Sequence, residues 1–168
     1  MLYIKNRIRF IQESLNMHAI AEEYIDGREL YASVLGNQTL TVFPLREVTF
    51  NEIPDDEPRI ATYKAKWDEK YRKRWGIKNV FAGRLPDGME EKIAKICKRA
   101  YRGLRMQGYA RFDLRLTPQN EVYILEANPN PMLRKDEDFA QSAEKGGLPY
   151  KDLIQKVLQL ALRRAEAH

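Results

Sequence analysis

The sequence contains few residues of the types that build covalent or histidine-based sites. Cys97 is its single cysteine, so an internal disulfide framework is excluded. Only two histidines occur, His18 and the C-terminal His168, which leaves no basis for a His-based zinc site or a catalytic triad. No run approaches the roughly 20 apolar residues that a membrane-spanning helix needs, and the N-terminus "MLYIKNRIRF" lacks the features of a signal peptide. These absences favour a cytoplasmic protein and argue against a membrane partner.

The charge is positive and admits an anionic partner. The net charge is +5 and the pI is about 9.3, which suits either nucleic acid or a phosphorylated ligand. Basic and aromatic residues interleave over residues 64–78, "KAKWDEKYRKRWGIK", so an RNA-binding loop is one alternative. The sequence contains no recognisable nucleic-acid motif. Nucleic acid is therefore the less favoured partner, and a phosphorylated ligand stays open at this point.

The order of the expected elements indicates an α+β fold. At 168 residues, one domain is the default. Apolar spacing predicts helices over 3–16, 89–105 and 150–164, with Asp87 as the N-cap of the second, and strands over 19–27, 29–36, 39–50, 109–116 and 121–127. Pro44 should interrupt the third strand, and residues 51–88 read as a long loop with short ordered pieces. We expect one domain over 1–168, an antiparallel sheet with helices packed on one face.

The hairpin over residues 109–127 carries polar residues at strand positions. Thr117 and Asn120 are predicted to close a turn, which places Arg111 opposite Glu126 and Asp113 opposite Ile124. Strand side chains alternate faces. One face should therefore hold Arg111, Asp113, Glu126 and Asn128, and the other should hold a core of Phe112, Leu114, Leu116, Tyr123 and Leu125.

Two carboxylates and a carboxamide on one face make an oxygen-rich site. Such ligands suit Mg²⁺ or Mn²⁺, which complete their coordination with water and phosphate oxygens. Arg111 beside them could hold an anion or a developing negative charge. The alternative is a solvated hairpin face whose arginine and glutamate merely pair across the strands.

Three stretches of the sequence resemble the ATP-grasp fold of D-alanine–D-alanine ligases. "AEEYIDGREL" resembles the segment that holds the adenine and ribose of ATP, and "ATYKAKW" resembles a "Y-x-x-K-Y" loop. "ARFDLRL…VYILEANPNP" resembles the motif "GR-x-D…E-x-N-x-x-P". Together they span roughly residues 20–133, in the order found in that family, and the closing helix also fits.

The resemblance implies a role for each matching residue. Asp113, Glu126 and Asn128 match the Mg²⁺ ligands, and Arg111 matches the catalytic arginine that contacts phosphate and the tetrahedral intermediate. Glu22, with the backbone of Glu23, Tyr24 and Ile25, matches the adenine-binding linker. Glu29 matches the carboxylate that binds the ribose hydroxyls, and Lys66 matches a phosphate-contacting lysine.

The implied activity is that of an ATP- and Mg-dependent carboxylate–amine ligase, in which an acyl phosphate is attacked by an amine to form a C–N bond. The match covers only the C-terminal part of the ATP-grasp domain, without the upstream N-terminal and lid subdomains. Stand-alone catalysis is therefore not expected, and a homo-oligomer or a complementing N-terminal half is a possible partner. The alternative is a nucleotide-binding or interaction module without catalysis. The loop after Pro131 also departs from the family pattern, since it is charged and offers Arg134 and Lys135 to a substrate carboxylate.

Overall fold

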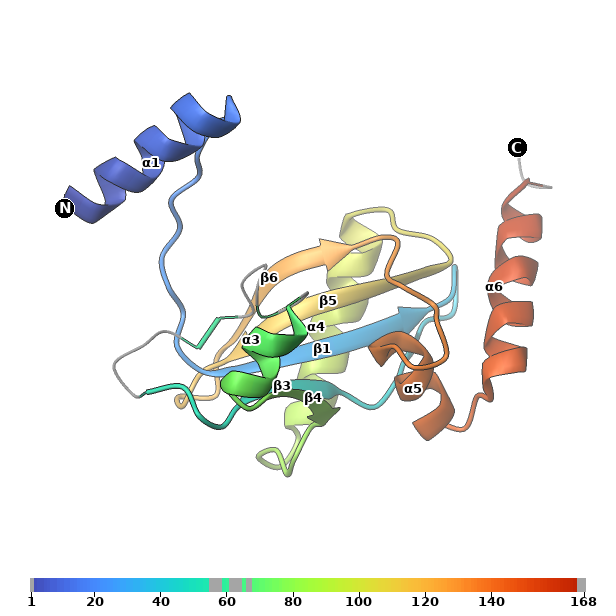
Figure 1. The fold of residues 1–168 in the computed structure, drawn as a ribbon. Coiled ribbons are helices and arrows are strands. Elements are labelled where there is room, and N and C mark those ends of the chain that lie inside the picture. Colours follow the sequence, from blue (N-terminus) through green and yellow to red (C-terminus); the bar gives the residue numbers. More distant parts are fainter. Residues whose placement is uncertain (1, 55–58, 61–64, 66–67, 166–168) are drawn as a thin grey trace.

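The computed structural model describes residues 2–54, 59–60, 65 and 68–165. Helix α1 (Leu2–Leu15) confirms the helix predicted over 3–16, and Figure 1 shows it standing apart from the rest of the chain. The strand predicted over 19–27 is wrong, because this segment is an irregular connection into the sheet. A strand needs a neighbour to pair with, and both edges of the strand that follows are taken by other strands. In the described part of the chain, no helix combines the length and apolarity needed to cross a membrane.

The centre of the molecule is an antiparallel sheet. Its strands are β1 (Arg28–Leu35), β2 (Thr41–Val42), β3 (Arg46–Phe50), β4 (Ile77–Phe81), β5 (Tyr109–Leu116) and β6 (Val122–Asn128). They lie in the order β4-β3-β1-β5-β6, with β2 paired to β1, and every pairing is antiparallel. The predicted interruption at Pro44 is confirmed, since it separates β2 from β3. Strand β4 was not predicted, because its five residues at a sheet edge carry too short a pattern to stand out from the loop around them.

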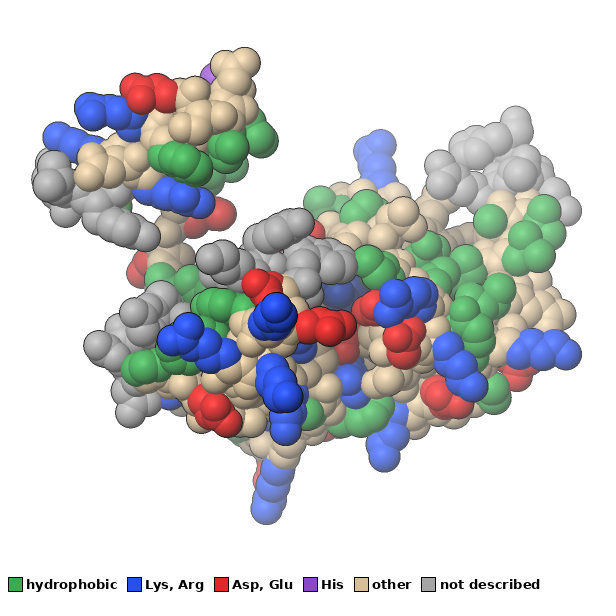
Figure 2. All heavy atoms as spheres, viewed as in Figure 1, with side chains coloured by type: hydrophobic (Ala, Val, Ile, Leu, Met, Phe, Trp, Pro, Cys, Tyr) green, Lys and Arg blue, Asp and Glu red, His purple; other side chains and the backbone are tan. Residues whose placement is uncertain are grey.

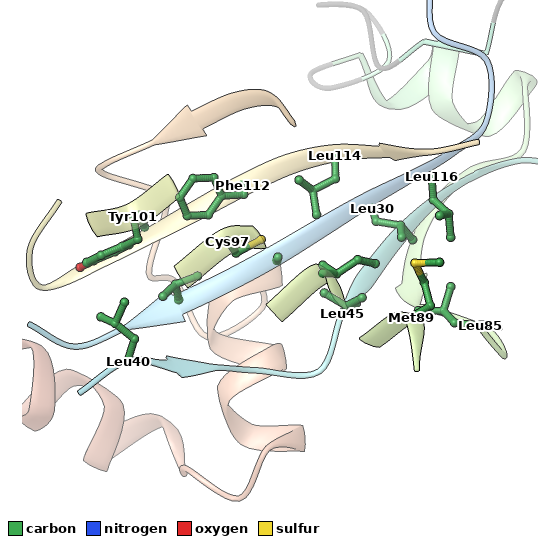
Figure 3. Close-up of a cluster of buried hydrophobic side chains, with 14 residues drawn as sticks. Leu30, Leu40, Leu45, Leu85, Met89, Cys97, Tyr101, Phe112, Leu114 and Leu116 are labelled. Atoms are coloured by element: carbon green, nitrogen blue, oxygen red, sulfur yellow. The ribbon is translucent and has the colours of Figure 1, made fainter. Parts of the chain in front are cut away.

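One face of the sheet is covered by helix α4 (Met89–Gly103). Met89, Ile93, Cys97 and Tyr101 form its buried stripe, at the helical spacing that predicted it. They pack on alternate residues of β1 and β5, including Leu30, Phe112 and Leu114 (Figure 3). The predicted N-cap Asp87 is wrong; the cap is Gly88, whose φ of 74° favours glycine.

Three further helices lie on the other side. Helix α3 (Glu69–Arg74) packs over Tyr31, Val48 and Ile77, while α5 (Asp138–Lys145) packs over Leu35 and Phe43. Helix α6 (Tyr150–Ala165) packs against α5 through Leu153 and Leu160. The α+β class with an antiparallel sheet is confirmed; within it, α4 covers one face, and α3 and α5 cover parts of the opposite face (Figure 1). The part of that opposite face between α3 and α5 carries the polar side chains predicted from the β5–β6 hairpin.

The register of the β5–β6 hairpin differs from the predicted one. Asn120 closes the turn on Thr117 as expected, but its φ of 64° adds a third residue to the loop, so Thr117 pairs with Glu121. A second one-residue shift follows between Asp113 and Leu114. The result is Asp113 opposite Glu126 and Arg111 opposite Asn128, and the predicted Arg111–Glu126 and Asp113–Ile124 pairs are wrong.

The same two shifts explain the error in the predicted core. Phe112, Leu114 and Leu116 are buried as expected, whereas Tyr123 and Leu125 are 40% and 49% exposed. Tyr123 lies opposite Arg115 and therefore faces away from α4, and Leu125 falls at the bulge, without a partner in the ladder. Two shifts of one residue restore the alternation, so Glu126 and Asn128 still share a face with Arg111 and Asp113.

Candidate functional site

The four polar residues predicted from the hairpin meet on the face of β5 and β6 that turns away from α4. Asp113 lies directly opposite Glu126, and Arg111 lies directly opposite Asn128. Arg111, Glu126 and Asn128 line a hollow of about 410 Å³, together with Tyr31 of β1 and residues of α5. Asp113 lies deeper and is 4% exposed. The strand alternation therefore brings all four side chains into one place.

Arg111 and Asp113 form a close ion pair inside this site. Arg111 Nε donates to Asp113 Oδ1 at 2.7 Å, and Arg111 Nη2 donates to Asp113 Oδ2 at 3.0 Å. The guanidinium carbon also lies 4.3 Å from the centre of the Tyr31 ring. Burial lowers the pKa of Arg111, but the hydrogen bonds and charge of Asp113 raise it. Electrostatic interactions with Tyr31 and Asp138 also raise this pKa, and the net shift is upward. The guanidinium is thus a fixed positive charge at the floor of the hollow.

The donor atoms at this site fit a hard divalent cation. Asp113, Glu126 and Asn128 offer two carboxylates and one carboxamide, and directly opposed strand residues have Cβ atoms about 4.5–5.5 Å apart. Among the residues that the structure describes, no group of three or more His, Cys, Asp or Glu side chains is arranged to hold a metal. An ion would therefore rely on Asn128, water or phosphate for its remaining ligands. Because Arg111 already contacts both oxygens of Asp113, an ion would share that carboxylate or displace the guanidinium.

Glu29, predicted to bind ribose, is buried and accepts hydrogen bonds from neighbouring side chains. Its Oε2 accepts a hydrogen bond from Arg115 Nη2 at 3.0 Å, and its Oε1 accepts one from the Tyr31 hydroxyl at 3.3 Å. Glu29 lines a second hollow of about 510 Å³, which it shares with Arg59. The hollow that contains Glu126 includes Tyr31 and not Glu29. The structure thus places the two predicted ends of the site in adjacent hollows, with Tyr31 linking them.

The predicted adenine-binding linker precedes β1. Its residues Glu22, Glu23 and Tyr24 are exposed and Ile25 is half-buried. Arg115 attaches this segment to the sheet, since its Nη1 donates to the Gly27 carbonyl at 2.8 Å and its guanidinium carbon lies 5.7 Å from the Tyr24 ring. Lys66 lies outside the described residues, so its predicted position is not placed by the structure.

A second polar network closes the other wall of the hollow that contains Arg111 and Asn128. Arg46 Nε donates to Asp138 Oδ1 at 3.0 Å, and Asn79 Nδ2 donates to Asp138 Oδ2 at 2.6 Å. Arg72 Nη2 then donates to Asn79 Oδ1 at 2.9 Å, and its Nη1 bonds the Ala65 carbonyl. This chain ties β3, β4, α3 and α5 together beside Tyr31. Figure 2 shows acidic and basic side chains intermixed over α3 and α5.

Arg134 and Lys135, the basic residues after Pro131, lie outside the hollow that contains Arg111 and Asn128. Arg134 holds Asp136 through two hydrogen bonds of 3.1 and 2.8 Å, and both side chains are largely exposed. Lys135 lines a separate surface hollow beside Phe81. Neither Arg134 nor Lys135 lines the hollow that contains Arg111 and Asn128.

Two residues at the centre of the site were not predicted from the sequence. Tyr31 and Arg115 each contact predicted site residues, yet neither was singled out. The signal for Tyr31 was its position two residues after Glu29 on the same strand, which puts both on one face. The signal for Arg115 was the same alternation, two residues after Asp113. The alternation does not show that β1 pairs with β5, and this pairing places Glu29 opposite Arg115.

Comparison with known proteins relates the sequence and the fold of this chain to a family. Residues 7–159 match the family described as D-ala D-ala ligase C-terminus. A D-alanine–D-alanine ligase of Desulforudis audaxviator is 34% identical over 146 residues, which are 86% of this chain and 44% of that protein. The uncharacterized protein y4sG of Sinorhizobium fredii is 29% identical over 96% of this chain and 46% of its own length.

A solved structure shares the fold. The D-alanine–D-alanine ligase from Bacillus anthracis complexed with ATP superposes with a TM-score of 0.72 at 19% identity, over 98% of this chain and 49% of that one. The chain thus spans less than half the length of the relatives it matches here. With a family match over most of its residues, this chain belongs to the D-ala D-ala ligase C-terminal family, the C-terminal part of the ATP-grasp fold.

Proposed function

We propose that the chain is the ATP- and magnesium-binding half of a ligase that joins a small carboxylate to an amine through an acyl phosphate. The family match supports the ligase class, and the geometry of the hairpin face supports the cofactors. The observation that carries the proposal is the pair Asp113 and Glu126, directly opposite each other beside Arg111 and Asn128.

The proposed roles follow from the chemistry of each side chain. Asp113, Glu126 and Asn128 would hold Mg²⁺, which neutralises phosphate charge when it is bound. Arg111 would contact phosphate oxygens and the developing negative charge, since a guanidinium donates in a planar fork. At the nucleoside end, Glu29 would accept from the ribose, and residues 22–25 would hold the base. Lys66 would add a phosphate contact.

Turnover is proposed to need more protein than these 168 residues. The chain spans less than half of its relatives, so the remaining wall of the nucleotide cleft would come from further sequence, a complementing chain or a second copy. Acyl and phosphoryl transfer depend on in-line positioning of both reactants, which one open wall does not enforce. A cytoplasmic location is part of the same proposal.

Calorimetry of Mg·ATP binding to the purified chain tests the proposal. We expect binding that requires Mg²⁺ and that weakens at least tenfold in Asp113→Asn. Asp136→Asn is the matched control, because Asp136 also pairs with an arginine but lies exposed on another surface. ATP binding that is independent of Mg²⁺, or unchanged in Asp113→Asn, would contradict the proposed site.

A nucleotide-binding or interaction module without catalysis is the second candidate. Ile154, Leu158 and Leu162 form an apolar row on α6 and are 39%, 58% and 55% exposed, at a spacing of four residues. Hydrophobic side chains are visible along α6 in Figure 2. Release of ADP on addition of amino acids, in a preparation that contains the complementing half, would favour the ligase. Binding without any ADP release would favour the module.

A further inference from the structure

Tyr31 lies in the middle of a row of polar side chains that crosses β1 and β5. The row begins with Arg115, which donates to Glu29 at 3.0 Å, and Glu29 accepts from the Tyr31 hydroxyl at 3.3 Å. It continues with Arg111, whose guanidinium carbon lies 4.3 Å from the centre of the Tyr31 ring. It ends at Asp113, which accepts two hydrogen bonds from Arg111. Tyr31 is thus the side chain through which the two ion pairs are joined.

The orientation of the Tyr31 ring is set by apolar packing. The residue is 3% exposed and packs with Val48, Ala65 and Ile77 beneath α3. Its polar partners therefore contact a ring that is already fixed, and a fixed aromatic face holds a guanidinium by cation–π attraction. Burial, and then the negative charge of Glu29, raise the pKa of the Tyr31 phenol, so the hydroxyl stays protonated and donates.

We infer that Tyr31 is the positioning residue of the proposed nucleotide site. Its ring holds Arg111 at the phosphate end, and its hydroxyl holds Glu29 at the nucleoside end. The inference rests on the proposed function and deepens it, because it assigns one side chain to the alignment of both ends. The two roles use different atoms of Tyr31, so substitution separates them.

Two variants of Tyr31 and two ligands test the inference in the 168-residue chain. Tyr31→Phe keeps the ring, so binding of Mg·tripolyphosphate should be unchanged, while binding of Mg·ATP should weaken several-fold. Tyr31→Leu removes ring and hydroxyl, so Mg·tripolyphosphate should bind about tenfold more weakly, since a desolvated cation–π contact is of the order of a tenfold change in affinity. Mg·ATP should lose that factor and, in addition, the several-fold factor lost in Tyr31→Phe. Calorimetry measures the affinities of the wild type and of both variants for each ligand, six in all.

Tyr101 offers a matched control. It is 1% exposed, donates one hydrogen bond to the Gly36 carbonyl at 2.8 Å, and packs on the α4 side of the same sheet. Tyr101→Phe and Tyr101→Leu remove the same atoms from a buried site on the opposite face of the sheet, away from Arg111. Neither should change the affinity for Mg·tripolyphosphate in the folded chain.

An NMR signal of Arg111 reports on positioning without any ligand. The ¹⁵N order parameter of its Nε–H group, which donates to Asp113, should be high in the wild type and in Tyr31→Phe, and should fall in Tyr31→Leu, where no ring holds the guanidinium. If the order parameter stays high in Tyr31→Leu, or if it falls equally in Tyr101→Leu, Tyr31 does not position Arg111 and the inference is overturned. If the wild type binds neither ligand, the proposed function fails for this chain, and the NMR signal still decides whether Tyr31 positions Arg111.

Discussion

Replacing Glu29 by Gln should destabilise the fold as well as the proposed ribose contact. The side chains of Glu29 and Arg115 are 5% and 2% exposed and meet at 3.0 Å. Removing one charge of a buried pair leaves the other uncompensated, which costs about 3–5 kcal/mol. Arg115 also donates to the carbonyls of Gly27 and Arg59, which leaves it partly solvated by the main chain. We therefore expect a loss at the lower end of that range, about 3 kcal/mol, from a total free energy of unfolding of about 5–15 kcal/mol.

Urea unfolding followed by circular dichroism measures this loss. With a slope of about 2 kcal/mol per molar urea, a change of about 3 kcal/mol lowers the midpoint by about 1.5 M. Asp136→Asn is the control, because the Arg134–Asp136 pair is 68% and 70% exposed and its midpoint should not move. Adding Arg115→Met to Glu29→Gln should recover part of the loss, since it removes the unpaired charge. A midpoint for Glu29→Gln that matches the control would refute the reasoning.

Two further predictions concern buried groups away from the site. Burial raises the pKa of the Cys97 thiol from 9.0 to about 12, so a thiol reagent at pH 8 should label this cysteine only after urea unfolds the chain. Between these two values the folded state keeps the proton that the unfolded state releases, so this contribution to stability should fall as the pH rises from about 9 to about 12. Ser142 Oγ is buried and has no hydrogen-bond partner among the described residues. Ser142→Ala should therefore raise the free energy of unfolding by about 1 kcal/mol, and a lower urea midpoint would contradict this.

Helices and strands that are determined by the residue pattern of a single segment were predictable from the sequence. The stripe of Met89, Ile93, Cys97 and Tyr101 identified α4, because a helix satisfies its own backbone and needs only one apolar face. Strands differ, because a segment becomes a strand only where an edge is available to pair with it. Residues 19–27 have strand-like composition and no free edge beside β1, while β4 has a weak pattern and the free edge of β3.

The site was predictable as a set of side chains and not as a set of contacts. Alternation along the hairpin was enough to group Arg111 and Asp113 with Glu126 and Asn128. The burial of Glu29 and the contacts of Tyr31 depend on the pairing of β1 with β5, two strands that are far apart in the sequence. Local patterns carry no information about that register, so neither the ion pair of Glu29 nor the cation–π contact of Arg111 could be predicted.

At the bulge in β6 the observed register departs from the one that the sequence pattern predicts, and deletions can test what the bulge contributes to the site. Leu125 is the extra residue between the Leu114–Ile124 and Asp113–Glu126 pairs, and it is 49% exposed. Deleting it should leave a regular ladder in which Glu126 still opposes Asp113, so Mn²⁺ binding should persist. Deleting Ala127 should turn either Glu126 or Asn128 toward α4, because one missing residue reverses the alternation. NMR cross-strand contacts report the register of both variants, and a folded Leu125 deletion with that register but no Mn²⁺ binding would show that the extra twist of the bulge itself positions the ligands.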